Sequence, residues 1–145
     1  MPDLTIRPAG PEDAEAVFGL LTQFVTSYQP ERQAFDRNFP RLISSGQSVF
    51  LVALFAGDAV GYALGNVALT LYANGPVLEL QELMVAPEHR GRGIGRRLVG
   101  AALERALAAG CTEATVPTRR ARDFYVRLGF EETAVFLKRK LKEGP

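Results

Sequence analysis

The sequence predicts a mixed α/β fold in a single domain that spans residues 1–145. Runs typical of strands and runs with apolar residues three and four apart, typical of helices, succeed one another in the order β-α-α-β-β-β-α-β-α-β. The 145 residues, 47% of them hydrophobic, can bury one core of ordinary size. Because the chain has no repeat, low-complexity stretch or linker-like segment, we expect no division into further domains.

The first part of the chain predicts one strand and two helices. Leu4–Arg7 alternates in polarity before a proline and is expected to form a short strand. A helix begins near Pro11, with acidic residues in its first turn and apolar residues at helical spacing from Ala16 to Phe24. A second helix is expected from about Glu31 to Gly46, interrupted at Pro40 because proline lacks the N–H that a helix interior requires.

Three β-like runs come next, and two turn signals connect them. The runs are Ser48–Phe55, Ala59–Leu71 and Val77–Val85. The segment Ala56-Gly57-Asp58 predicts a hairpin between the first two runs. The segment Asn74-Gly75-Pro76 then turns the chain into the third.

The C-terminal part alternates between predicted helices and strands. A helix is expected over Gly93–Ala109, followed by a strand over Thr112–Val116 and a second helix over Arg120–Leu128. Glu131–Leu137 is expected to form a final strand. The remaining Lys138–Pro145 is basic and is expected to fray.

Composition excludes several classes of protein. The net charge of +1 gives no global field that would attract nucleic acid or a membrane, and the basic tail lacks an accompanying aromatic platform. The apolar runs fall short of the ~20 residues of a membrane span, and the N-terminus lacks a signal-peptide pattern. The single Cys111 excludes an internal disulfide framework, and one histidine cannot complete a typical zinc site with it. We therefore expect a cytoplasmic protein without a metal, a membrane segment or a nucleic-acid partner.

The most informative segment runs from Met84 to Gly100, where an apolar strand ends at a proline, a glycine-arginine loop follows, and an apolar-periodic helix begins. Glycines let the backbone approach a ligand closely and adopt positive φ. A helix that opens near Gly93 directs free N–H groups and its positive dipole end at the same place, which favours phosphate. The glycines and arginines of the loop and of the first helical turn are Arg90, Gly91, Arg92, Gly93, Gly95, Arg96 and Arg97.

This loop is neither of the two common phosphate motifs. The third glycine of a dinucleotide fingerprint is missing, and no G-K-[ST] run of a P-loop occurs in the chain. The loop resembles the acyl-coenzyme A loop of the GNAT superfamily of N-acetyltransferases, whose pattern is [RQ]-x-x-G-x-[GA]. Arg90, Gly93 and Gly95 fill that pattern without a gap. An L-x-V-x-P pattern that begins at Leu83 strengthens the resemblance.

A second block, R-A-R-D-F-Y-V-R-L-G-F at residues 120–130, resembles the C-terminal signature of the same superfamily. The resemblance implies a GNAT fold with a mixed sheet of about six to seven strands, about four helices on both faces, and central strands that splay apart. Pro117 is expected to end the pairing of the strand that precedes this block, because proline has no N–H for a ladder.

The resemblance also implies that acetyl-CoA is the cosubstrate. Its pantetheine arm is expected to lie between the splayed strands as an added strand, and its pyrophosphate against the glycine loop. At Thr118 the chain departs from the family, which often has asparagine there, although a hydroxyl can still hydrogen-bond a cofactor amide. The cofactor contacts implied in this way involve Leu83, Met84, Val85, Arg90, Gly91, Arg92, Gly93, Ile94, Gly95, Arg96 and Thr118.

Tyr125 is the implied general acid. The family places this hydroxyl beside the coenzyme A sulfur, and a phenol with its ordinary pKa of about 10 can protonate a departing thiolate at neutral pH. We expect Phe124, Leu128 and Phe130 to pack into the core, with Tyr125 pointing elsewhere. The alternative is that Tyr125 is one more packing aromatic.

Two carboxylates are candidates for the general base. An alkylamine with a pKa near 10.4 must lose a proton before it attacks, and a carboxylate at the strand end can accept it. Glu79 and Glu82 both lie in the run that precedes the loop, and related enzymes suggest either position. Strand alternation places them on opposite faces unless a bulge intervenes. Both stay open, with Glu82 preferred.

The expected activity is transfer of an acetyl group from acetyl-CoA to a primary amine, by direct attack in a ternary complex and without a metal. The acceptor is a small molecule, a protein N-terminus or a lysine, and a homodimer is possible. Phe35, Phe39, Tyr62 and Tyr72 either line the acceptor pocket or belong to the core. Two alternatives are a catalytically silent coenzyme A-binding module with the same fold and a nucleotide-binding α/β domain.

Overall fold

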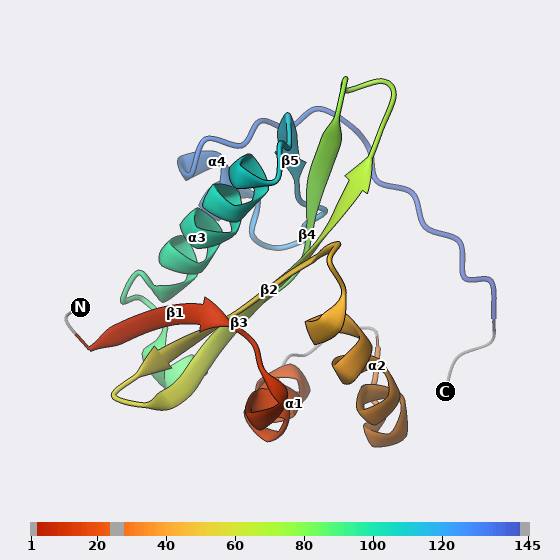
Figure 1. The fold of residues 1–145 in the computed structure, drawn as a ribbon. Helices are drawn as coiled ribbons and strands as arrows, with labels where there is room; N and C mark the ends of the chain where they lie inside the picture. The colour runs from red at the N-terminus through yellow and green to blue at the C-terminus, as the bar shows by residue number, and fades with distance from the viewer. Residues whose placement is uncertain (1–2, 24–27, 143–145) are drawn as a thin grey trace.

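Five strands form one mixed sheet in the order β1-β2-β3-β4-β5 in the computed structural model, which describes residues 3–23 and 28–142 (Figure 1). The first four strands are antiparallel to their neighbours, and β5 is parallel to β4. The predicted fold class is confirmed, with fewer strands than expected. The strands are β1 (Leu4–Pro8), β2 (Ser48–Phe55), β3 (Asp58–Leu69), β4 (Pro76–Val85) and β5 (Glu113–Thr115).

Helices cover both faces of this sheet (Figure 1). Short 3-10 turns precede α1 and α3 at Pro11–Asp13 and Pro87–His89. One face of the sheet is covered by α1 and α2, and the other by α3 with α4 beside it. The α-helices are α1 (Ala14–Thr22), α2 (Arg32–Ser44), α3 (Ile94–Ala108) and α4 (Arg122–Arg127).

The central strands are apolar on both sides because each face has its own core. In β2, Leu51 and Ala53 belong to the core under α3, whereas Phe50 and Val52 belong to the core under α1 and α2. A strand buried on both faces reads as a continuous apolar run rather than as an alternating one. The run S-V-F-L-V-A-L-F therefore follows from the position of β2 in the middle of the molecule.

A half-buried ion pair connects β1 to the start of α1. The Arg7 guanidinium donates to both oxygens of Asp13, at 2.8 and 3.0 Å, and the backbone N–H of Gly10 donates to the same carboxylate at 2.8 Å. Burial alone would raise the pKa of Asp13, but these hydrogen bonds and the Arg7 charge outweigh it and lower the pKa. The carboxylate thus stays ionised and fixes the first turn after the strand.

The last predicted strand is absent. Residues 131–140 adopt no regular secondary structure and are exposed throughout, so the prediction for Glu131–Leu137 is wrong for the isolated chain. A strand needs a neighbour to take up its backbone hydrogen bonds, and no described strand lies alongside this segment. The sequence of this segment shows a preference for extended structure, but that preference does not provide a neighbouring strand to pair with.

The predicted break at Pro40 is also wrong, because α2 continues through it. The Pro40 ring is exposed, and the Ser44 hydroxyl donates to the Pro40 carbonyl at 2.8 Å. The solvent-facing position lets the helix tolerate the missing N–H. Phe24, expected on the apolar face of the first helix, lies outside the described residues.

Candidate functional site

The pairing of β4 with β5 stops well before β4 ends. Their last aligned pair is Glu79 and Thr115, whereas β4 continues to Val85. Pro117 follows the end of β5 and has no N–H to extend the ladder. The expected separation of the central strands is therefore present, and it leaves Leu80–Val85 without a strand on this side.

Backbone groups along this free edge follow the alternation of an antiparallel ladder. Ala86 donates its N–H to the Val60 carbonyl at 2.8 Å, so Met84, two residues earlier, also directs its backbone groups at β3. The backbone N–H groups of Leu83 and Val85 consequently point toward the space that β5 leaves open. Of the three predicted backbone contacts, Leu83 and Val85 face the gap and Met84 does not.

A bulge in β4 changes where the two glutamates point. Leu64 is aligned with Glu82 and Gly65 with Leu80, so Gln81 is the extra residue. Gly65 allows the close approach, because a Cβ on it would lie 2.9 Å from the Glu79 carbonyl oxygen.

Both carboxylates therefore lie on one face of the sheet. The flanking Leu78 and Leu80 belong to the core under α3, which places Glu79 on the opposite face. Glu82 meets Tyr62, a member of the core under α1 and α2, and so lies on that face too. The two glutamates were expected on opposite faces unless a bulge intervened, and the bulge at Gln81 is what brings them to the same face.

Tyr62 holds the Glu82 carboxylate. Its hydroxyl donates to Glu82 Oε1 at 2.7 Å, and the side chain is 1% exposed. Burial, followed by the charge and the hydrogen bond of Glu82, raises the pKa of Tyr62 far above its ordinary value. The phenol therefore stays protonated and donates. The sequence alone could not reveal this contact, because it depends on the register between β3 and β4.

The glycine loop has the backbone geometry that its sequence predicts. Gly91 and Gly93 adopt φ of 78° and 81°, and apart from their chain neighbours no atom of the described residues lies within 4 Å of the position that a Cβ would take on either glycine. Gly95 differs, since it lies in the first turn of α3 and a Cβ there would lie 3.5 Å from Phe124.

The N-terminus of α3 offers free hydrogen-bond donors beside this open space. The first helical bond runs from the Arg97 N–H to the Gly93 carbonyl at 3.1 Å. The N–H groups of Ile94, Gly95 and Arg96 thus have no acceptor within the helix.

Four arginines surround the loop and the first turn of α3. All four are exposed, and none forms an ion pair with any residue in the described part of the chain. The Arg90 side chain bends back and donates to the Val85 carbonyl at 3.2 Å. This end of α3 therefore combines unpaired positive charge with free backbone donors. The arginines are Arg90, Arg92, Arg96 and Arg97.

Tyr125 is more buried than its sequence context predicted. It is 6% exposed and packs edge-on against Phe124 and Phe130, at 5.0 and 5.5 Å between ring centroids. The expectation that Tyr125 points away while Phe124, Leu128 and Phe130 fill the core was wrong, since all four contribute to the core under α3. Tyr125 is simply the residue that α4 turns furthest toward the sheet.

The Tyr125 hydroxyl is nevertheless not fully enclosed. It forms no hydrogen bond with any described residue, and His89 Nδ1 is the only fully buried side-chain polar atom without a partner among those residues. Burial of the ring raises the pKa of Tyr125, so the phenol is protonated at neutral pH. A protonated, unoccupied donor thus lies on the side of the sheet opposite to Glu82.

Thr118 has a local structural role. Its hydroxyl oxygen accepts a hydrogen bond from the Ala121 N–H at 3.1 Å, just before α4. The side chain is exposed, and its hydroxyl proton stays available to another acceptor.

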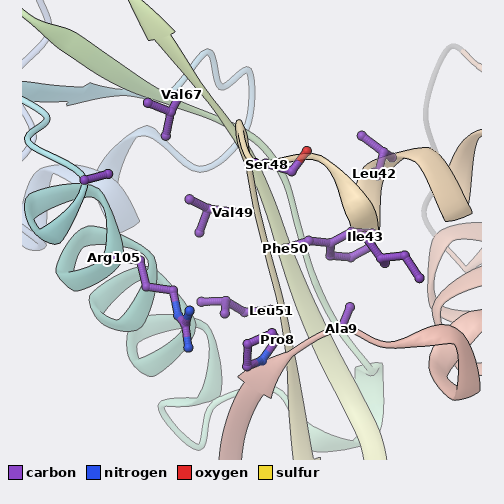
Figure 2. Close-up of a pocket in the computed structure, with 12 residues that line it drawn as sticks. Pro8, Ala9, Leu42, Ile43, Ser48, Val49, Phe50, Leu51, Val67 and Arg105 are labelled. Carbon is purple, nitrogen blue, oxygen red and sulfur yellow. The ribbon is translucent and has the colours of Figure 1, made fainter.

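A cavity of about 250 Å³ lies apart from these residues (Figure 2). It lies at the edge of β2, beyond the point where β1 ends, and between α2 and the C-terminal half of α3. In the sheet, β2 is two strands away from β4. Its walls are mostly apolar, and Arg105 is its only charged residue. None of the predicted site residues lines it. The lining residues are Pro8, Ala9, Leu42, Ile43, Gly46, Ser48, Val49, Phe50, Leu51, Val67, Arg105 and Ala109.

Metal ligands do not gather anywhere in the described part of the chain. No group of three or more histidine, cysteine or carboxylate side chains is close enough there to hold an ion. Among the same residues, no helix has the length and apolar character needed to cross a membrane.

Comparison with known proteins agrees with this geometry. The chain is 31% identical over 137 residues to an aminoalkylphosphonate N-acetyltransferase of Salmonella typhimurium, covering 92% of this chain and 88% of the relative. It is 30% identical over 138 residues to glucosamine 6-phosphate N-acetyltransferase 1 of Oryza sativa subsp. japonica, covering 90% and 82%.

Solved structures share the fold. A protein described as a transcriptional regulator from Bacillus halodurans C-125 superposes with a TM-score of 0.87 at 26% identity, covering 95% of this chain and 99% of that one. An aminoglycoside N-acetyltransferase solved with CoA superposes with a TM-score of 0.84 at 24% identity, covering 96% of this chain and 95% of that one. The model of the acetyltransferase (GNAT) family matches residues 15–130. The chain therefore belongs to the GNAT family of N-acetyltransferases, enzymes that transfer the acetyl group of acetyl-CoA to amines.

Proposed function

We propose that acetyl-CoA binds along the free edge of β4, with its diphosphate at the start of α3. The observation that carries this proposal is the unpaired edge of β4 leading directly to the glycine loop. An amide-rich pantetheine arm can take up the Leu83 and Val85 backbone groups as an added strand would. Free N–H groups, the helix dipole and the nearby arginines suit the negative charge of the diphosphate.

Glu82 is the proposed general base. In the reaction the amine nitrogen attacks the thioester carbonyl carbon, and the base accepts the proton that the nitrogen loses. The hydrogen bond from Tyr62 fixes the carboxylate while leaving Glu82 Oε2 for the proton or for a bridging water. Glu79 lies on the same face of the sheet, on the other side of the bulge at Gln81, and it is the competing candidate for the base.

Tyr125 is the proposed general acid. When the tetrahedral intermediate collapses, the carbon–sulfur bond breaks, and the departing thiolate takes the phenolic proton. Its ring is fixed in the core under α3, and its hydroxyl forms no hydrogen bond with any described residue. The gap between β4 and β5 is the route by which groups from the two faces approach one thioester.

The proposed acceptor is a primary amine. The relatives named above act, by their names, on an aminoalkylphosphonate and on glucosamine 6-phosphate, which both carry an amine. The face of β4 that bears both glutamates is the one covered by α1 and α2, so these helices are the proposed walls of the acceptor site.

Gly93→Val should abolish acetyl-CoA binding. The added side chain fills the open space proposed for the diphosphate and opposes the positive φ. Gly110→Val is the matched control, since Gly110 lies just past the other end of α3 with φ of 85° and equally open surroundings. Calorimetry on both folded variants should show binding lost at position 93 and retained at position 110. Equal affinities in the two variants would refute the diphosphate site.

Glu82→Gln should lower kcat/KM most at neutral pH, with partial rescue at high pH where the amine loses its proton unaided. The assay follows release of the coenzyme A thiol with the best acceptor from a panel of primary amines. Glu79→Gln should show a smaller loss. Tyr62→Phe keeps the Glu82 carboxylate but removes the hydrogen bond that holds it. The kcat/KM of this variant should therefore lie between those of wild type and Glu82→Gln.

A larger defect in Glu79→Gln than in Glu82→Gln would assign the base to Glu79. Equal loss at every pH in both variants would contradict general-base catalysis by either carboxylate. Binding of acetyl-CoA without turnover of any amine would instead favour the catalytically silent coenzyme A-binding module.

Tyr125→Phe should cut kcat by roughly 10²–10⁴-fold, nearer the lower end because a thiol is a good leaving group. Acetyl-CoA affinity should change little, because the ring keeps its contacts with Phe124 and Phe130. Full activity of the variant across pH 6 to 9 would show that the hydroxyl is dispensable and that Tyr125 is structural.

A further inference from the structure

Positive charge gathers around Tyr28, which lies between α1 and α2 in the chain. Lys138 Nζ donates to the Tyr28 hydroxyl at 3.1 Å and lies 4.9 Å from the centre of its ring. Lys140 Nζ lies 5.5 Å from the same centre. The ammonium groups of both lysines are therefore within the range of a cation–π contact with one aromatic side chain.

Arg119 brings a further positive charge to the same place. The hydrogen bond from Lys138 lowers the pKa of Tyr28 most, and the charges of both lysines and of Arg119 act in the same direction. Arg119 is thus near enough for its charge to act on the Tyr28 hydroxyl. These four residues are called here the Tyr28 cluster, and they are Tyr28, Arg119, Lys138 and Lys140.

The lysines of the cluster come from the end of the chain. Residues 131–142, called here the C-terminal segment, run as an extended trace from α4 to the side of the molecule that carries α2 (Figure 1). Lys138 and Lys140 are two residues apart, so an extended backbone directs both to one side and directs Arg139, between them, to the other. The basic residues of the segment are therefore arranged around Tyr28 and not simply dispersed in solvent.

The positive charge of the Tyr28 cluster has no counter-charge in the described part of the chain. Neither lysine nor Arg119 forms an ion pair with any residue there. By contrast, Arg7, Arg32 and Arg122 are each paired with a carboxylate. Like charges held close together repel one another, so the arrangement favours an anion that comes from outside the chain. All three cations are exposed and accessible to such an anion.

The Tyr28 cluster borders the proposed acceptor site. α1 contacts β3 and β4 on the face that carries Glu82, and Tyr28 belongs to the connection that follows this helix. Arg119 lies in the loop after β5, the strand whose separation from β4 opens the gap. The C-terminal segment leaves α4 on the α3 side of the sheet and reaches Tyr28 on the other side. Three distant parts of the chain thus meet on the side from which the proposed acceptor approaches Glu82.

We propose that the amine acceptor carries a phosphonate or phosphate group, which the Tyr28 cluster binds while the amine reaches Glu82. This inference rests on the acetyl transfer proposed above and narrows its substrate class. Three cations match a tetrahedral group with up to two negative charges better than they match a carboxylate with one. The same cations repel an acceptor with a second ammonium group, so polyamines are disfavoured.

The test is the acceptor selectivity of wild type and of the double variant Lys138→Gln, Lys140→Gln. The acceptors are ethylamines that differ only in the group on the second carbon, which is a phosphonate, a carboxylate, a hydroxymethyl or an aminomethyl group. In wild type kcat/KM should fall in that order. In the double variant the ratio of kcat/KM for the phosphonate to that for the hydroxymethyl acceptor should fall about tenfold, mainly through KM for the phosphonate.

Arg139→Gln is the matched control. It removes one positive charge from the same segment, but its side chain is directed away from Tyr28, so the wild-type ratio should be retained. All three substituted residues are exposed, and circular dichroism verifies that the variants are folded. Calorimetry should show the same affinity for acetyl-CoA in every variant. A weaker affinity for acetyl-CoA in the double variant, with an unchanged acceptor ratio, would assign the cluster to a phosphate of the cofactor and overturn the proposal.

The remaining outcomes separate this inference from the proposed function. Equal kcat/KM for the phosphonate and hydroxymethyl acceptors in wild type would overturn the inference while leaving acetyl transfer to amines in place. If no amine is acetylated, the proposed transfer fails, and calorimetry with the phosphonate tests the cluster by itself. Binding that weakens in the double variant but not in Arg139→Gln supports the anion site, and binding that is absent or equal in all variants overturns it.

Discussion

β4 loses its parallel neighbour after Glu79, and from there to Val85 its outward backbone groups meet no other strand. Unpaired backbone donors and acceptors require a partner, and on this edge the Arg90 side chain reaches only the Val85 carbonyl. The geometry is imposed locally, because β5 is short and Pro117 cannot extend its ladder. Without this separation the sheet would be continuous, and the groups on its two faces would have no common space.

The bulge at Gln81 complements that separation. It rotates the end of β4 so that Glu79 and Glu82 share one face, and it aligns Glu82 with the Tyr62 hydroxyl. The glycine loop begins only a few residues later, so the strand connects the proposed base directly to the proposed diphosphate site. In this proposal, one strand sets the relative positions of the proposed base, the thioester and the proposed diphosphate site.

Sequence patterns were sufficient for elements whose partners are near in the chain or whose faces are fully buried. The order of elements as far as α4, the glycine loop with positive φ at Gly91 and Gly93, and the early end of β5 were all predicted from local signals. The bulge was left open as an alternative, and the Tyr62–Glu82 hydrogen bond was not predicted, because both depend on the register between strands. The C-terminal segment failed as a strand for a related reason, since propensity does not provide a neighbour.

The central claim is that acetyl-CoA completes the free edge of β4, and amide exchange measured by nuclear magnetic resonance tests it residue by residue. Saturating acetyl-CoA should slow exchange at the Leu83 and Val85 amides at least tenfold. The Met84 amide, already directed at β3, should exchange at the same slow rate with and without acetyl-CoA. Unchanged exchange at Leu83 and Val85 in protein saturated with acetyl-CoA would contradict the account.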